Sequence, residues 1–244
     1  MLKKTVKYLM IAIAACYALF AFVFVPSIKD RQTCKGVLVN ITDNGIEAIN
    51  RENIMDFLKG ENLDPSGLEM KDFECRGMEE FISNISLVKK CQVYKSTRGY
   101  VNIDIECRTP ALIVQDKENG NYSIDNEGNR IFGIQKAMRL PIVTGHITDE
   151  TAQAGLKEIA GAIQGNKFWE AQIEQVHFKE NGNVIMIPRV GDHIIELGKA
   201  EKVDEKLEKL YLFYKKGMNT VGWNKYSRLN IEFNDKVICT RKEK

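Results

Sequence analysis

The sequence predicts an α+β protein in three parts: an N-terminal transmembrane helix, a small β-α-α-β-β domain, and a β-rich domain with an antiparallel sheet and two or more helices. Three observations predict this organisation. Tyr8–Val25 is an apolar run without a charge. Residues 34–108 alternate between strand and helix patterns in the stated order, and strand patterns predominate in residues 109–244.

The apolar run predicts a membrane anchor over residues 8–25. A helix that rises about 1.5 Å per residue would span roughly 27 Å over this run, which approaches the hydrocarbon thickness of a bilayer. Lys3, Lys4 and Lys7 precede it. Because such charges resist translocation, residues 1–7 are expected to form a cytoplasmic tail and the body to lie outside. Pro26 ends the helix, and residues 26–33 form a tether.

Two other interpretations of this segment remain open. A cleaved signal peptide also starts with a basic region, but its apolar core is usually about 7–15 residues long and a small-x-small site follows it. No such site follows Val25. A lipoprotein is the second alternative, because Ile13–Cys16 resembles a lipobox, but an apolar run follows Cys16 where a polar tether is expected.

Composition indicates a globular body and excludes one class of partner. Charged residues make up 28% of the chain and apolar residues 44%, as in ordinary folded domains. The net charge is +2 and the pI about 8.1. This balance lacks the strongly basic footprint of a nucleic-acid-binding protein.

The cysteines favour a packing role. Five of the six lie in the body, and no C-x-x-C motif is present, which weakens both a redox and a zinc interpretation. We expect most of them to be unpaired, small, buried groups, with one disulfide as the alternative. They are Cys34, Cys75, Cys91, Cys107 and Cys239.

The first domain is expected to span residues 34–108. A strand at Lys35–Ile41 is followed by a turn at Asp43–Gly45 and a helix that Asn50 caps and Gly60 ends. A second helix carries Met78, Phe81, Ile82 and Ile85, and strands follow at Val88–Tyr94 and Tyr100–Cys107. A three-stranded sheet with both helices on one face would bury the apolar positions, and this order resembles a POTRA domain.

The second domain is expected to span residues 109–244, since Thr109-Pro110 breaks the chain. Tyr122–Phe132 predicts two strands around a tight turn at Gly128, and Leu140–Gly145 predicts an extended segment. Strands are further expected at Ile173–Phe178, Val184–Ile187, His193–Leu197, Ser227–Phe233 and Val237–Arg241. A helix capped by Thr148 is expected over about Asp149–Ile163, with Ala152, Leu156, Ile159 and Ile163 on one side. A last helix is expected over Val203–Tyr214, burying Leu207, Leu210, Tyr211 and Tyr214 and ending at Gly217.

Motifs for catalysis are missing from the sequence. It contains no G-x-S-x-G, no H-E-x-x-H and no phosphate-binding glycine loop. The three histidines, His146, His177 and His193, are interpreted as surface or hydrogen-bonded groups. We therefore predict that the protein is not an enzyme, has no catalytic residue, and binds neither a metal nor a cofactor.

Several runs in the right order resemble the bacterial cell-division family FtsQ, called DivIB in Gram-positive bacteria. The resemblance covers essentially the whole chain. Glu106–Ala111 resembles the family's E/x-R-x-P-A junction, and Ile195–Gly198 with the helix after it resembles its x-L-G segment. The other runs are Tyr122–Gly128 (Y-x-I-D-x-x-G), Leu140–Gly145 (L-P-x-V-x-G) and Leu229–Phe233, where the family usually has I-D-L-R-Y. Asn230 and Glu232 depart from that last pattern.

The resemblance implies a non-enzymatic divisome scaffold in the inner membrane. Family members are single-pass type II proteins with most of the chain in the periplasm at the division septum. They bind the small coiled-coil proteins FtsB and FtsL, and the resemblance extends the partners to FtsK, FtsW and the septal transpeptidase. It implies no nucleic acid and no small-molecule substrate.

The resemblance also implies a partner-binding edge near the C-terminus, where the family captures FtsB by strand addition. Terminal strands commonly lie at sheet edges, where unpaired backbone groups accept a partner strand. The expected contact residues are Phe233, Val237, Ile238, Cys239, Thr240 and Arg241. The alternative is that Phe233, Val237 and Ile238 are core residues and that another strand forms the edge.

Two other function classes remain open from the sequence. One is an exported, membrane-anchored hydrolase of the cell envelope. The other is a secretion or outer-membrane assembly component, because POTRA domains also occur there. A single unit with a helical anchor favours the divisome interpretation.

Overall fold

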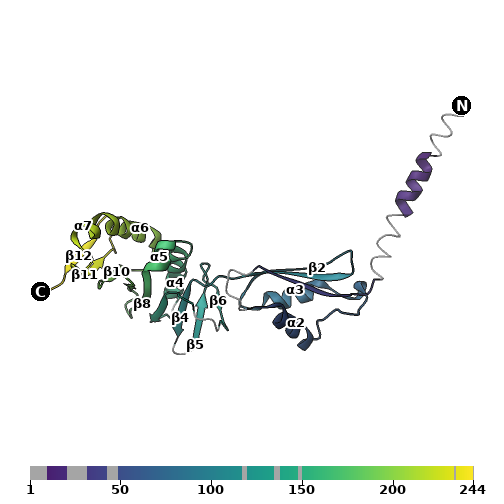
Figure 1. The fold of residues 1–244 in the computed structure, drawn as a ribbon, viewed down its shortest axis with the longest axis horizontal. Helices are drawn as coiled ribbons and strands as arrows, with labels where there is room; N and C mark the ends of the chain where they lie inside the picture. The colour runs from purple at the N-terminus through teal and green to yellow at the C-terminus, as the bar shows by residue number, and fades with distance from the viewer. Residues whose placement is uncertain are drawn as a thin grey trace. The chain divides into compact units, whose positions relative to one another are not determined.

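The structure is a computed structural model, which describes residues 10–20, 32–42, 49–116, 120–134, 138–147, 150–233 and 235–243. It divides into two compact units, Met1–Cys107 and Arg108–Lys244. Figure 1 shows the elements of each unit along the chain. The units are described separately below.

The described part of the N-terminal apolar run, residues 10–20, is helical, and all its side chains are exposed. Among the described residues, no helix combines the length and the apolar character needed to cross a bilayer. The ends of the predicted anchor, the tail and most of the tether lie outside the described residues.

The first unit has the predicted β-α-α-β-β order. β1 (Gly36–Thr42) pairs in parallel with β3 (Tyr100–Cys107), and β2 (Val88–Lys95) pairs antiparallel with the other side of β3. The sheet order is therefore β1-β3-β2. Helices α2 (Arg51–Gly60) and α3 (Cys75–Ser83) lie on one face of this sheet (Figure 1), with a short 3₁₀ turn, Met70–Asp72, between them.

Local signals explain these elements. The Asn50 side chain accepts a hydrogen bond of 2.8 Å from the Asn53 N–H, so it caps α2 as predicted, a contact that typically stabilises a helix by about 1 kcal/mol. The helices bury Ile54, Leu58, Met78 and Ile82 against the sheet. The strands contribute alternate residues to the same core: Cys91, Val93, Val101, Ile103 and Ile105.

None of the six cysteines, all of which lie in the described part of the chain, forms a disulfide bond, and this agrees with the expectation from the sequence. Cys34, Cys91 and Cys107 are buried in the core of the first unit. Burial, with smaller contributions from Glu79 and Asp104, raises the pKa of the Cys91 thiol to about 11. This thiol is therefore protonated at neutral pH and acts as a small packing group.

The second unit contains a nine-stranded sheet in the order β12-β11-β10-β9-β8-β7-β4-β5-β6. Its strands are β4 (Leu112–Asp116), β5 (Gly120–Ile124), β6 (Arg130–Ile131), β7 (Ile142–Gly145), β8 (Ile173–Phe178), β9 (Val184–Pro188), β10 (Ile194–Gly198), β11 (Tyr226–Asn230) and β12 (Ile238–Arg241). Its helices are α4 (Glu150–Ile163), α5 (Lys167–Gln172), α6 (Val203–Phe213) and α7 (Asn219–Val221), with a π-helical turn, Tyr214–Met218, between the last two.

The prediction of an antiparallel sheet is wrong for part of this sheet, which is mixed. β4 and β7, β7 and β8, and β10 and β11 pair in parallel. Parallel neighbours need a long crossover, and helices supply it for two of these pairs, whereas β5 and β6 lie between β4 and β7 in the chain. α4 and α5 connect β7 to β8, and α6 connects β10 to β11. The strands at both ends of the sheet are antiparallel to their neighbours.

The helices cover one face of the sheet (Figure 1), and this face carries the core of the unit. α4 buries the predicted stripe of Ala152, Leu156, Ile159 and Ile163. Its predicted cap, Thr148, lies outside the described residues. Helix α5 was not predicted. Asn166 caps it by accepting hydrogen bonds from the N–H groups of Phe168 and Trp169.

The end of α6 also differs from the prediction. Gly217 does not end the helix, because the backbone continues through a π-helical turn into α7. Gly222, with φ +92°, follows α7 and supplies the left-handed conformation instead. Tyr211 was expected to be buried but is 38% exposed, because it lies on the outer side of α6.

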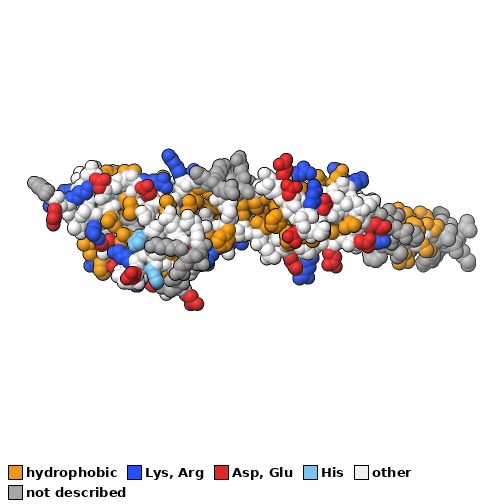
Figure 2. Space-filling model, turned by 90° about the horizontal axis from the view of Figure 1, so that it is seen from below, with side chains coloured by type: hydrophobic (Ala, Val, Ile, Leu, Met, Phe, Trp, Pro, Cys, Tyr) orange, Lys and Arg blue, Asp and Glu red, His pale blue; other side chains and the backbone are white. Residues whose placement is uncertain are grey.

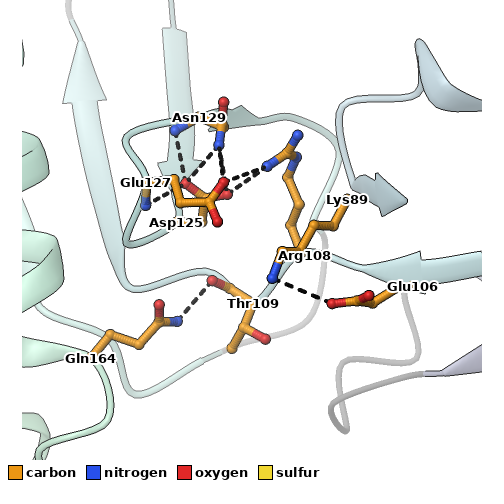
Figure 3. Close-up of polar contacts among 8 residues, drawn as sticks. All are labelled: Lys89, Glu106, Arg108, Thr109, Asp125, Glu127, Asn129 and Gln164. Carbon is orange, nitrogen blue, oxygen red and sulfur yellow. Dashed lines mark hydrogen bonds and ion pairs between the residues drawn. The ribbon is translucent and has the colours of Figure 1, made fainter. Parts of the chain in front are cut away.

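A buried carboxylate organises the start of the second unit (Figure 3). Asp125 is 3% exposed and accepts hydrogen bonds from the Glu127 N–H, from the backbone and side chain of Asn129, and from Arg108 at 2.8 Å. These contacts close the turn between β5 and β6, where Gly128 has a φ of +85°. Gln164 at the end of α4 donates to the Thr109 carbonyl at 2.8 Å, which fixes the entering chain.

The hydrogen bonds to Asp125 outweigh its burial. Burial alone would raise the pKa of this carboxyl, but the bonds from Asn129 and Arg108 lower it below its ordinary value. The charged form therefore stabilises the fold. This contribution is present above the pKa of an unfolded aspartate, about 4, and is lost as the pH falls through the lower pKa of the folded state.

We expect Asp125→Asn to lower the free energy of unfolding of the second unit by about 2 kcal/mol at pH 7, because a charged acceptor of several hydrogen bonds is lost. The difference from the unsubstituted protein should shrink below about pH 4, where the carboxyl of the unfolded chain becomes protonated while that of the folded protein still resists protonation. Both tryptophans lie in the second unit, so urea unfolding followed by tryptophan fluorescence reports on this unit.

Glu127→Gln is the matched control, since the Glu127 side chain is 54% exposed and lies 3.8 Å from Arg108. It should change the free energy of unfolding by less than about 0.5 kcal/mol. Equal effects of both substitutions at pH 7, or an Asp125→Asn effect that stays the same from pH 7 to well below pH 4, would contradict this account.

Candidate partner-binding edge

β12 lies at one end of the nine-stranded sheet and pairs only with β11 among the described strands. β6, at the other end of the sheet, has only two residues. β12 is the longer terminal strand, and its position agrees with the edge expected from the sequence.

Backbone alternation shows which groups of β12 point outward. The Lys242 N–H donates to the Lys225 carbonyl at 3.1 Å, and Thr240 and Ile238 lie opposite Arg228 and Asn230 of β11. In an antiparallel pair, alternate residues direct their N–H and C=O groups to the same side. Ile238, Thr240 and Lys242 therefore face β11, and the N–H groups of Cys239 and Arg241 point away from it. The Arg241 carbonyl accepts a hydrogen bond of 3.5 Å from the Ser227 hydroxyl of β11.

The side chains of the predicted contact residues divide into two groups. Val237 and Cys239 are partly buried and pack against the core of the unit. Phe233 and Ile238 are each 45% exposed, and Thr240 and Arg241 are also exposed. Phe233 and Ile238 are thus not core residues. The structure places Ile238, Cys239, Thr240 and Arg241 on β12, and Val237 immediately precedes this strand.

Phe233 lies outside the hairpin, contrary to the predicted strand Ser227–Phe233. β11 ends at Asn230, and the Ile231 N–H donates to the Glu196 carbonyl of β10 at 2.9 Å. The ammonium group of Lys209 on α6 donates to the Ile231 carbonyl at 3.0 Å and also to the Phe233 carbonyl. The segment after β11 is therefore held by α6 and β10 and does not continue the ladder with β12.

Lys209 was missed from the sequence, because nothing in a helical pattern marks which lysine will reach a distant carbonyl. Burial, with the neighbouring Lys206, lowers the pKa of Lys209, and Asp235 acts in the opposite direction. The two carbonyl contacts use two of the three N–H donors of its ammonium group, and they hold the segment that follows β11.

Polar contacts between β10 and β11 explain one departure from the family pattern. Glu196 accepts a hydrogen bond of 2.6 Å from Arg228 and one of 3.4 Å from the amide of Asn230. The Asn230 side chain also accepts from the Glu232 N–H at 3.0 Å. Aspartate at position 230 would place a second carboxylate beside Glu196, so the amide suits this site better.

The second departure has a packing consequence. A Cβ atom added to Gly198 would lie 2.6–2.9 Å from the side chain of Glu232, so Glu232 packs directly over this glycine. Gly198 also has φ +73°, a conformation that side chains rarely adopt. The glycine of the x-L-G run is therefore required both by the backbone and by its neighbour.

At one edge of the small sheet in the first unit, unlike at β12, a side chain accepts an outward backbone N–H. The Ser96 N–H donates to the Tyr100 carbonyl, so by alternation the Val93 N–H of β2 points away from β3. The carboxylate of Glu79 on α3 accepts this N–H at 2.9 Å. On β12, no described side chain accepts the outward N–H groups of Cys239 and Arg241. Glu79 therefore occupies one outward N–H of β2, whereas the outward N–H groups of Cys239 and Arg241 lack a side-chain acceptor among the described residues.

The groups that could support catalysis or metal binding are dispersed. Among the described residues, no three histidine, cysteine or acidic side chains lie close enough together to hold a metal ion. His177 lies 3.0 Å from the Thr144 hydroxyl, and the buried His193 lies 2.7 Å from the Tyr214 hydroxyl. Burial lowers the pKa of His193, so this ring is neutral at pH 7. On the face shown in Figure 2, acidic and basic side chains are interspersed.

Comparisons with known proteins agree with these features. A family model for "FtsQ/DivIB, C-terminal related" matches residues 109–240, and a POTRA-like domain model matches residues 32–106. Comparison with curated proteins gave no match. The first match covers more than half of the 244 residues and confirms the resemblance found in the sequence. The chain belongs to the FtsQ/DivIB, C-terminal related family, with a POTRA-like domain preceding the matched region.

Proposed function

We propose that this protein is a non-enzymatic scaffold of bacterial cell division that captures a partner by adding a strand to β12. Membership of the FtsQ/DivIB-related family supports the division role. The single observation that supports the binding mode is the position of β12 at the end of the sheet, with the N–H groups of Cys239 and Arg241 directed outward.

The proposed partners are FtsB- and FtsL-like coiled-coil proteins. An extended segment of the partner would bond to the outward N–H and C=O groups of β12, and side chains beside the strand would set specificity. Ile238 and Phe233 offer exposed apolar surface for this purpose, and Val237, Thr240 and Arg241 flank it. Contacts with FtsK, FtsW and the septal transpeptidase belong to the same proposal through the family resemblance.

We further propose that residues 8–25 anchor the protein in the inner membrane and that the tail, residues 1–7, stays in the cytoplasm. The uncharged run and the lysines before it support this arrangement. Residues 26–33 would then act as a tether to the POTRA-like domain, residues 34–108, and the FtsQ-type domain, residues 109–244, would lie beyond it at the septum.

Cys239→Pro is expected to weaken the capture of an FtsB-like partner at least tenfold, because proline lacks the outward N–H. Proline at position 238 would be a poorer test, since Ile238 faces β11 and its N–H belongs to the hairpin. Binding is measured by pull-down of full-length protein with the FtsB- and FtsL-like proteins of the same bacterium. Tryptophan fluorescence verifies that the second unit remains folded.

Cys239→Ala is the matched control, because it removes the thiol and keeps the backbone N–H. It should bind the partner as the unsubstituted protein does. Undiminished capture by a folded Cys239→Pro variant would place the interface on another surface.

Depletion of the protein in its host should stall septation and produce filaments, as expected for a divisome scaffold. A plasmid copy of the unsubstituted protein or of the Cys239→Ala variant should restore division, and Cys239→Pro should not. Normal cell length after depletion would refute the division role. Rescue by Cys239→Pro would refute only the strand-addition mode.

A further inference from the structure

A groove between α5 and α6 lies apart from β12. It has a volume of about 410 Å³. Its lining comes from the end of α4, from α5, and from the outward side of α6: Ala162, Asn166, Phe168, Trp169, Asp204, Leu207, Glu208 and Tyr211. The α6 residues follow the spacing i, i+3, i+4, i+7, so they form one stripe along the helix. Figure 1 shows the two helices next to each other.

Aromatic rings form the apolar part of this groove. The ring of Phe168 lies 4.8 Å from that of Trp169 and 4.9 Å from that of Tyr211, in edge-to-face arrangements. Trp169 is only 2% exposed and lies at the inner side, whereas Tyr211 is 38% exposed. The contacts among the three rings hold them in place, and Tyr211 remains accessible to a ligand.

The charged groups of the groove have one sign. Asp204 and Glu208 are exposed, lie one helical turn apart, and form no ion pair with any described residue. Among the described residues, no lysine or arginine lines the groove. Like charges at positions i and i+4 destabilise a helix by a few tenths of a kcal/mol. A bound cation would remove the repulsion between these two carboxylates.

We propose that the α5–α6 groove binds an arginine side chain of a partner protein, presented within an apolar segment. A guanidinium group stacks on aromatic faces and donates hydrogen bonds to carboxylates in a planar fork, which matches this combination of rings and acids. The buried Leu207 and Ala162 give the groove an apolar floor that aliphatic neighbours of the arginine would cover. This site is separate from strand addition at β12 and could serve the same or another partner.

The test uses the full-length protein with Trp223→Phe, which leaves Trp169 as the sole fluorescent tryptophan. The probe is the capped peptide acetyl-Ala-Leu-Arg-Leu-Ala-amide. We expect saturable changes in Trp169 emission. A peptide with citrulline in place of arginine should bind at least tenfold more weakly, because it keeps the shape and loses the charge. The binding should also weaken as the salt concentration rises.

Two sets of variants locate the site. Asp204→Asn combined with Glu208→Gln should weaken binding of the arginine peptide at least tenfold. Glu205→Gln, on the same helix but outside the groove, should not change it. Absence of a saturable response, equal binding of the citrulline peptide, or equal binding by the double variant would each overturn the proposal.

Discussion

The termination of backbone hydrogen bonding at the sheet edges is the constraint on which the rest of this structure depends. An N–H or C=O group at the edge of a sheet must find water, a side chain or another strand. In the first unit, the carboxylate of Glu79 accepts a hydrogen bond from one such N–H group, that of Val93 on β2. In the second unit, β6 is too short to offer a ladder, and β12 keeps its outward groups accessible. This difference between the two edges is the basis of the binding role proposed for β12.

Helix α6 determines where that edge begins. It connects the parallel strands β10 and β11 and buries Leu207 and Leu210 in the core. On one side, Lys206 donates to the Leu197 and Lys199 carbonyls at the end of β10, and Lys209 donates to the carbonyls that follow β11. The helix therefore holds the ends of both strands. Its outward side carries the acidic and aromatic groove, so one element serves packing, edge definition and a second candidate surface.

The motifs that resemble the family are explained by structural demands. Arg108 and Asp125, which belong to two separate runs, form one buried ion pair. Gly145 ends the L-P-x-V-x-G run at a position where an added Cβ would lie 2.0 Å from the Phe178 carbonyl oxygen. These residues build the framework that positions β12, and the candidate contact residues themselves carry no comparable motif. The residues that resemble the family therefore predict the fold better than they predict the partner.

The sequence alone determined the elements whose signals are local. Neighbouring residues determine the cap at Asn50, the buried stripe of α4 and the alternation in β2 and β3. They do so because helix and strand periodicities need no distant partner. The tertiary structure alone decided the parallel pairing of β10 with β11, the contact between Lys209 and the Ile231 carbonyl, and the exposure of Phe233 and Tyr211. Each of these depends on groups far apart in the chain, and their meeting is fixed by how the helices pack on the sheet rather than by any local pattern.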